Sequence, residues 1–162
     1  MACRRGPNSP NIQFVSDPMP TVHPSTDQQM TPEQTILAMF DHLDERRYDE
    51  LLSLMTPQAV WHRQGKRLQG HAQILAALNE RSASQRIRHL VTNLLQRSAS
   101  DDSASFSHYM TALRFDDGQA HDGPVTVRQP YRMSLVTTQL VRTGGVWRVA
   151  EQAIVTEFEF ST

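Results

Sequence analysis

A carboxylate inside an apolar pattern is the first feature of the sequence that suggests chemistry. Asp44 comes seven residues after Leu37 and four after Phe40, so on an α-helix it falls on the same stripe as these apolar side chains. A buried carboxylate without a partner costs several kcal/mol. We therefore expect either that Asp44 has a buried partner, or that the helix ends near Leu43 and leaves Asp44 in solvent.

A histidine further along the chain shows a similar conflict. It belongs to a run of alternating residues that share one face of a predicted strand: Ile87, His89, Val91, Asn93 and Leu95. An imidazole on the core side of a sheet needs a hydrogen-bond partner, and such a histidine is more often structural than catalytic. If the helix covers this face of the sheet, Asp44 can accept from one ring nitrogen of His89 and leave the other free as a general base. Such a pair needs neither a metal nor a cofactor, and we expect none.

Five other residues are candidates for contacts with a substrate. Trp61 and Arg63 share one face of a short strand, and Asn93 is the other polar residue on the face of His89. His108 alternates with two apolar residues on another strand, and Tyr131 begins a third. For each of them, ordinary packing is the competing interpretation. The remaining histidines lack the spacing of metal ligands, so we predict no metal site.

The elements that must position these residues begin with helices. Thr31-Pro32-Glu33-Gln34 has the pattern of a capping box with proline at the first helical position. The helix that follows is predicted to bury Ile36, Leu37, Met39, Phe40 and Leu43. A second short helix is predicted to contain Tyr48, Leu51, Leu52, Leu54 and Met55 and to end before Pro57. A strand over 59–62 and a third helix marked by Ile74, Leu75 and Leu78 follow.

The second half of the chain alternates with a period of two and predicts strands. The first predicted strand starts at Arg86, and three more cover 104–115, 131–142 and 146–160. The turn at 143–145 joins the last two strands as a hairpin. Helices followed by long antiparallel strands predict an α+β domain in which the helices cover one face of a curved sheet.

Composition limits the remaining possibilities. The chain has 162 residues, a formal net charge of -1, seven histidines and a single cysteine, Cys3. These values exclude a disulfide scaffold, a multi-cysteine zinc ribbon and a polybasic nucleic-acid binder. No apolar run is long enough to cross a membrane, so we expect a cytoplasmic protein that binds neither nucleic acid nor membrane. Residues 1–29 contain five prolines and no periodicity, which predicts a disordered arm before a single domain over 30–162.

Several short segments resemble the SnoaL-like branch of the nuclear transport factor two-like superfamily. They are Leu43-Asp44-Glu45-Arg46-Arg47-Tyr48-Asp49-Glu50-Leu51, Thr56-Pro57, Arg86-Ile87-Arg88-His89-Leu90-Val91-Thr92-Asn93 and Gly145-Val146-Trp147-Arg148-Val149-Ala150. The resemblance covers about residues 31–160. It implies a cone-shaped fold, in which a strongly curved sheet surrounds a hydrophobic pocket, N-terminal helices cover its concave side, and two chains form a homodimer.

The resemblance also implies a chemistry. Scytalone dehydratase, the bile-acid dehydratase and the hexachlorocyclohexane dehydrochlorinase of this superfamily share an Asp-His dyad, and Asp44 and His89 match it. The implied reaction removes a proton next to an activating group, with loss of water or halide or the shift of a double bond. The chain departs from the dehydratases at Leu43, Ala112 and Val136, where they carry polar residues. We therefore expect a lyase or isomerase acting on a small hydrophobic cyclic molecule, without assigning a dehydration as such.

Two noncatalytic functions compete with this hypothesis. The segment around His89 also resembles the small subunit of ring-hydroxylating dioxygenases, in which this histidine would only pack. The chain would then be a small-molecule-binding or oligomer-assembly domain. A protein-interaction module like the transport factor itself would instead have a filled pocket and an exposed apolar patch on the outer face of the sheet.

Overall fold

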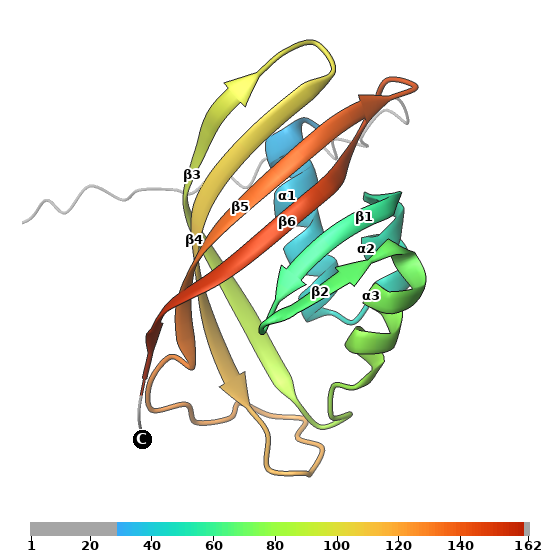
Figure 1. Cartoon of the computed structure of the whole chain (residues 1–162). Coiled ribbons are helices and arrows are strands. Elements are labelled where there is room, and N and C mark those ends of the chain that lie inside the picture. Colours follow the sequence, from blue (N-terminus) through green and yellow to red (C-terminus); the bar gives the residue numbers. More distant parts are fainter. Residues whose placement is uncertain (1–28, 161–162) are drawn as a thin grey trace, which may run out of the picture.

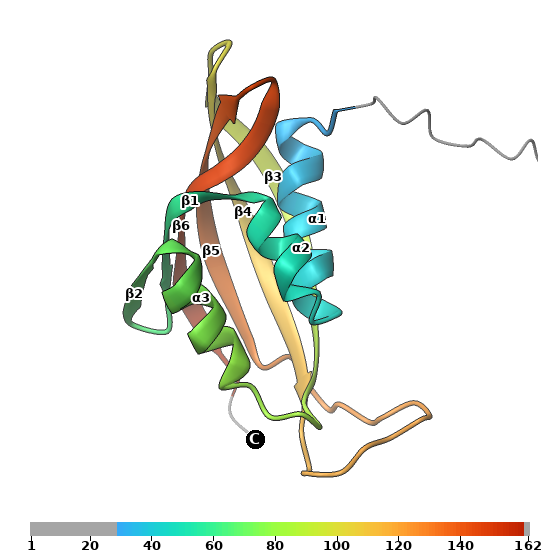
Figure 2. The same ribbon diagram turned by 90° about the vertical axis from the view of Figure 1, so that its right-hand side faces the viewer.

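Three helices lie on one face of a six-stranded sheet in the computed structural model, which describes residues 29–160 (Figures 1 and 2). The elements are α1 (Pro32–Asp44), α2 (Tyr48–Ser53), β1 (Met55–Arg63), β2 (Lys66–Gln69), α3 (Gly70–Asn79), β3 (Arg86–Ala99), β4 (Ser103–Phe115), β5 (Arg132–Thr143) and β6 (Val146–Glu159). The predicted N-terminal arm lies outside the described residues except for Gln29. Within the described part of the chain, no helix is long and apolar enough to cross a membrane.

Helix α1 begins at the predicted capping box. Thr31 Oγ1 accepts from the Gln34 amide at 3.3 Å, and Gln34 Oε1 accepts from the Thr31 amide at 2.9 Å. The helix continues to Asp44, so the alternative in which it ends at Leu43 and leaves Asp44 in solvent is wrong. The prediction that Leu37 is buried is also wrong: Leu37 lies at the edge of the apolar stripe and is 48% exposed.

The segment after α1 differs from the prediction in two places. Met55, which is predicted in the second helix, belongs to strand β1, and so does Pro57. Pro57 is tolerated there because the β1–β6 pairing is interrupted between Met55 and Val60, so no ladder bond is needed from its nitrogen. Strand β2, which pairs with β1 as a hairpin, is short and was not predicted.

The sheet has the strand order β2-β1-β6-β5-β4-β3, and all neighbours are antiparallel except β1 and β6. The predicted β5–β6 hairpin is present. Gly144 and Gly145 form its two-residue turn, and both have a positive φ, which suits this tight turn. Figure 2 shows the curvature of the sheet and the three helices on its concave side.

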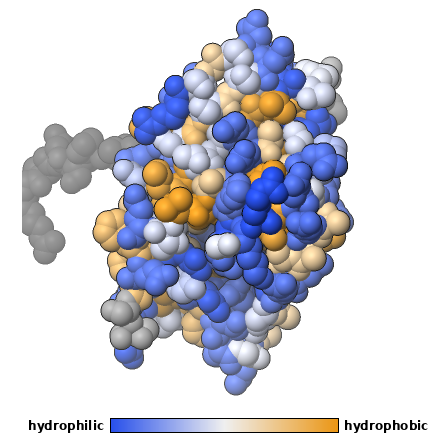
Figure 3. All heavy atoms as spheres, in the orientation of Figure 1, coloured by the Kyte–Doolittle hydropathy of each residue, from blue (hydrophilic) through white to orange (hydrophobic). Residues whose placement is uncertain are grey.

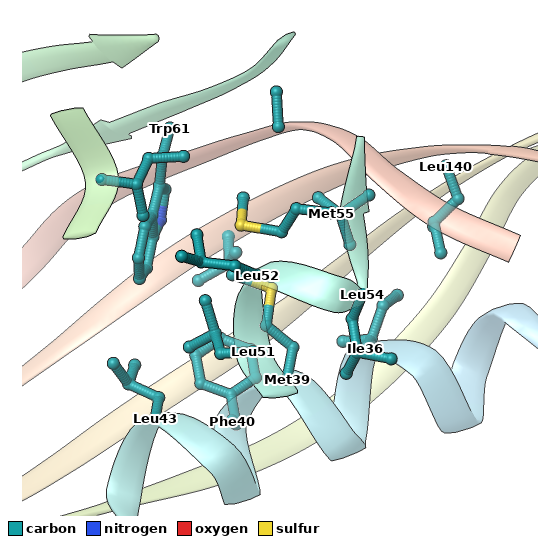
Figure 4. Close-up of a cluster of buried hydrophobic side chains, with 14 of the residues drawn as sticks. Ile36, Met39, Phe40, Leu43, Leu51, Leu52, Leu54, Met55, Trp61 and Leu140 are labelled. Carbon is teal, nitrogen blue, oxygen red and sulfur yellow. The ribbon is translucent and has the colours of Figure 1, made fainter. Parts of the chain in front are cut away.

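The hydrophobic core fills the space between the helices and this concave face. Ile36, Met39 and Phe40 of α1 point toward the sheet, where they meet Met55 and Trp61 of β1 (Figure 4). All of these side chains are buried, and their burial holds α1 in a fixed position over the long strands.

A β-bulge changes the predicted inner face of β3. Asn93 has φ of +54°, and the β3–β4 register shifts between Thr92 and Leu95. The extra residue reverses the alternation, so Leu94 packs against the core and Leu95 is 51% exposed. The prediction that Asn93 and Leu95 share the face of His89 is therefore wrong. His89 and Val91 precede the bulge and pair with Ala112 and Met110 of β4, which are buried.

Candidate active site

Asp44 and His89 form a closely held pair where the end of α1 meets the start of β3. The Asp44 carboxylate accepts from the backbone amide of His89 through Oδ2 at 2.8 Å, and Oδ1 lies 2.5 Å from Nδ1 of the imidazole. Only 9% of the Asp44 side chain and 8% of the His89 side chain are exposed. Since a carboxylate can only accept, the ring proton lies on Nδ1 and the lone pair of the neutral ring lies on Nε2.

Neighbouring contacts fix both members of this pair. Arg81 donates to the carbonyl of Leu43 at 2.8 Å, and Arg46 donates to the carbonyl of Gln85 at 3.0 Å, so the end of α1 is tied to the α3–β3 connection. Phe40 lies against the imidazole, with 5.6 Å between the ring centroids. The backbone and ring bonds to Asp44 together leave His89 little freedom to rotate, which is the condition for a positioned base.

His89 lines a cavity of about 380 Å³ between α3, the concave face and the segments that follow α3 and β4. Its apolar wall contains Leu43, Trp61, Ile87, Met110, Ala112 and Ile154. No residue in the range 29–160 forms a hydrogen bond with Nε2 of His89. Because Nδ1 is occupied by Asp44, Nε2 is the ring nitrogen that a molecule in this cavity can reach.

The remainder of the cavity wall is mostly polar and contains several charges, which corrects the expectation of a hydrophobic pocket. Four arginines line it, Arg63, Arg81, Arg114 and Arg132, together with the acidic residues Glu80 and Asp116. The formal net charge of -1 did not indicate these arginines, because acidic side chains elsewhere in the sequence offset their charge.

The structure brings three of the five predicted contact residues to this cavity. Trp61 is fully buried in its wall, and the Arg63 guanidinium lies over the Trp61 ring at 4.7 Å from the centroid. Tyr131 stands partly exposed at the cavity, with Arg114 and Arg132 over its ring. Whether any of them contacts a substrate stays a prediction.

Asn93 and His108 do not reach the cavity. Asn93 is exposed at the bulge, where its positive φ suits the local backbone. His108 is 1% exposed in the core, and its ring meets Phe40 edge-on at a centroid distance of 5.4 Å. Neither ring nitrogen of His108 has a hydrogen-bond partner.

Arg81 and Arg132 are two of the charged cavity residues that were not predicted from the sequence. Arg81 comes seven residues after Ile74 and three after Leu78, so it continues the apolar stripe of α3 just as Asp44 continues that of α1. Arg132 alternates with Ser134 and Val136 on the buried side of β5. The same search for charges on apolar faces would have found both.

The departures from the dehydratases lie partly in this cavity. Leu43 and Ala112 line it, and Ala112 pairs directly with His89 across the β3–β4 ladder. Val136 is buried in the core instead. The cavity is therefore apolar at two of the three positions where the dehydratases carry polar residues. Among the described residues, no group of three or more His, Cys, Asp or Glu side chains is placed to hold a metal ion.

Comparison with known proteins agrees with this architecture. A protein-family model described as a SnoaL-like domain matches residues 33–152. Comparison with curated proteins gives no significant match. This model and the solved structures below confirm the predicted α+β fold with helices on a curved sheet.

Three solved structures illustrate the similarity. A protein from Catenulispora acidiphila in complex with S-DNPA is 24% identical, with a TM-score of 0.62 over 77% of this chain and 90% of that chain. A protein from Novosphingobium aromaticivorans named "Putative Scytalone Dehydratase" is 14% identical, with a TM-score of 0.63 over 80% and 85%. A nuclear transport factor two-like protein with a cystatin-like fold from the same genus and species is 16% identical, with a TM-score of 0.62 over 76% and 77%. At these identities the likeness concerns the fold alone.

The buried His108 leads to a prediction about stability and pH. Burial lowers the pKa of His108 from 6.5 to about 4. Between these two values the unfolded chain binds a proton that the folded chain does not, so this residue lowers the free energy of unfolding as the pH falls from 6.5 to about 4 and has no such effect above 6.5. The loss amounts to roughly 3 kcal/mol. Urea denaturation across this pH range should show that His108→Leu removes this part of the acid destabilisation.

The control for this measurement is His121→Leu, because His121 is an exposed histidine that pairs with Asp117 on the surface. Its denaturation profile should keep the acid loss that His108 causes. Parallel profiles for wild type and His108→Leu between pH 6.5 and 4 would contradict the assignment.

Proposed function

The chain belongs to the SnoaL-like domain family, and we propose that it is a lyase or isomerase in which His89 removes a proton from a small cyclic substrate. The single observation that carries this proposal is the Asp44–His89 pair, held at 2.5 Å on the wall of a cavity. One ring nitrogen of His89 is bound to the carboxylate, and the other is available to the cavity. This is the arrangement of a positioned general base.

The proposed step uses only side chains of this protein. Nε2 of His89 accepts a proton from a carbon next to an activating group, and the electron pair of that C–H bond forms a new double bond. In a lyase reaction the neighbouring carbon loses its leaving group with the bonding pair, and the imidazolium returns the proton to that group. In an isomerase reaction a double bond shifts and the same proton is returned to another carbon. The Asp44 carboxylate stabilises the imidazolium in either case.

The cavity supports this function over the two noncatalytic alternatives. In a histidine that only packs, as in a dioxygenase small subunit, both ring nitrogens are expected to be buried or hydrogen-bonded. The second ring nitrogen of His89 instead has no partner in the described part of the chain and lies at a cavity. A protein-interaction module of the transport-factor type was expected to have an exposed apolar patch on the outer face of the sheet and a filled pocket. The patch is present, but the pocket is not filled, because the cavity has a volume of about 380 Å³. The Catenulispora acidiphila protein was crystallised with S-DNPA, which supports a small-molecule ligand for this chain.

Turnover of a substrate tests the proposal. The full chain is incubated with a panel of cyclic β-hydroxy ketones and unsaturated cyclic ketones. Loss of water is followed by mass spectrometry, and the shift of a double bond, which leaves the mass unchanged, is followed by ¹H NMR. His89→Ala should reduce turnover by roughly 100-fold or more, because it removes the base. Asp44→Asn should reduce it by at least about tenfold, because the amide no longer stabilises the imidazolium.

His121→Ala provides the matched control, since His121 also bonds an aspartate, Asp117 at 2.8 Å, but lies outside the cavity. This variant should retain wild-type turnover. Turnover that survives both His89→Ala and Asp44→Asn in folded protein would defeat the catalytic assignment.

We propose further that two chains associate through the outer face of the sheet. The strand pairing aligns Leu90, Thr111, Met133 and Phe158 in one row on this face, and Val155 lies in the next row. Leu90, Val155 and Phe158 are each at least half exposed, and Figure 3 shows hydrophobic patches among polar side chains on the face seen in Figure 1. Burying these side chains against a second copy would favour a homodimer.

Sedimentation velocity of the full chain checks this proposal. The wild type should sediment with twice the chain mass of 18.4 kDa, and Val155→Lys should shift it to the single chain, because a lysine would be buried in the contact. Leu37→Lys is the control, since Leu37 is an exposed apolar residue on the helical side and should leave the dimer intact. A wild type that sediments as a single chain at micromolar concentration would contradict the proposal.

A further inference from the structure

The cavity that contains His89 collects positive charge from four separate elements. Arg63 ends β1, Arg81 follows α3, Arg114 lies near the end of β4, and Arg132 begins β5. In Figure 1 the α3–β3 connection and the β4–β5 loop lie at the same end of the molecule, which brings these arginines together. Four arginines against two acidic residues leave the cavity with an excess of positive charge.

The acidic residues of the cavity form no close ion pair with these arginines. Within residues 29–160, no carboxylate lies within 4.0 Å of the guanidinium nitrogens of the four arginines. Glu80 pairs with Lys66 at 3.4 Å, and Asp116 accepts a hydrogen bond from Ser84 at 2.7 Å. The two acids thus have other partners. Arg63, Arg81 and Arg132 are half-buried, and half-buried arginines usually have an acidic partner.

Two of the guanidinium groups have donors that are buried and unused. Nη1 of Arg63 and Nη2 of Arg81 are both shielded from solvent and have no hydrogen-bond partner. Arg81 is held in place by the carbonyl of Leu43 at 2.8 Å and by Oε1 of Gln85 at 3.3 Å. Arg63 is held against the Trp61 ring. A buried, unpaired N–H of a cation is costly, so an acceptor that reaches either guanidinium group would be favoured.

The charges are also close enough to repel one another. Burial, followed by the neighbouring charges of Arg81 and Arg132, lowers the pKa of Arg63 to about 10, and Tyr48 and Glu80 offset this only in part. Arg63 therefore stays positive at neutral pH, but burial and the neighbouring positive charges make its charged form energetically costly. An anion would relieve both the repulsion and the missing hydrogen bonds.

We propose that the substrate carries a carboxylate, which Arg63 and Arg81 bind through their unused donors while Arg132 adds a third positive charge. The flat guanidinium group matches a carboxylate in shape and charge. The apolar body of the substrate then lies against Trp61 and Met110 with its acidic C–H bond toward His89. This inference deepens the proposed function and rests on it for the role of His89, but binding of the carboxylate can be measured without any reaction.

Isothermal titration calorimetry with a matched pair of probes tests this proposal. The full chain is titrated with 2-naphthoate and with 2-naphthamide, which has nearly the same shape but no charge. The carboxylate should bind at least about tenfold more tightly than the amide. Arg63→Gln and Arg81→Gln should each reduce this preference to about threefold or less, because each variant loses one charged donor.

Two control variants show whether the preference depends on the arginines of the cavity and whether it is separate from the role of His89. Arg67→Gln removes an exposed arginine of β2 that does not line the cavity, and it should leave the preference unchanged. His89→Ala should also keep the preference, so loss of turnover in that variant and loss of carboxylate binding in the arginine variants are independent results.

The melting temperature distinguishes a binding role from a structural one. Arg63→Gln without ligand should melt no lower than the wild type, because the substitution removes an unpaired cation from a buried site. Equal affinity for the two probes, or no binding of 2-naphthoate, would overturn the proposal. So would a lowered melting temperature of Arg63→Gln combined with an unchanged preference for the carboxylate.

Discussion

The carboxylate of Asp44 links the fold of this protein to its chemistry. It accepts one hydrogen bond from the backbone amide of His89 and a second from the imidazole of the same residue. The first bond fastens the end of α1 to the start of β3, and the second orients the ring. A carboxylate buried in this way is stable only because both acceptor oxygens are used, so the position of the helix and the state of the histidine depend on the same group.

The cavity next to this pair combines two kinds of surface. Trp61, Met110 and Ile154 provide an apolar wall near the imidazole, and Arg63 and Arg81 bring unpaired donors to the same space. An apolar wall favours a ring or hydrocarbon, whereas desolvated guanidinium groups favour an anion. Together these surfaces suit a small organic acid better than the small hydrophobic molecule that the family resemblance implied. Holding the charged Arg63 in a desolvated place without a counterion costs free energy, and a bound anion would reduce this cost.

The candidate site could be predicted from the sequence where a polar residue interrupts an apolar pattern. Asp44 and His89 could be paired in advance because each is a polar residue on an apolar face, and the structure places them in contact. Arg81 follows the same logic and could have been found. The inner face of β3 beyond Val91 could not have been predicted, because the bulge at Asn93 depends on the pairing of β3 with β4. The only sign of the bulge in the sequence is an asparagine, a residue that tolerates a positive φ. Likewise, Pro57 lies in a strand because the β1–β6 ladder is interrupted there, which is a property of the assembled sheet.

The position of the proton on the neutral His89 ring tests the role of Asp44 most directly. Long-range ¹H–¹⁵N NMR of the imidazoles, recorded at a pH where they are neutral, distinguishes a proton on Nδ1 from a proton on Nε2. We expect that His89 carries its proton on Nδ1, and that Asp44→Ala abolishes this preference because the acceptor is removed. A proton on Nε2 in the wild type, or the same tautomer in both proteins, would show that Asp44 does not orient the ring and would contradict the central claim.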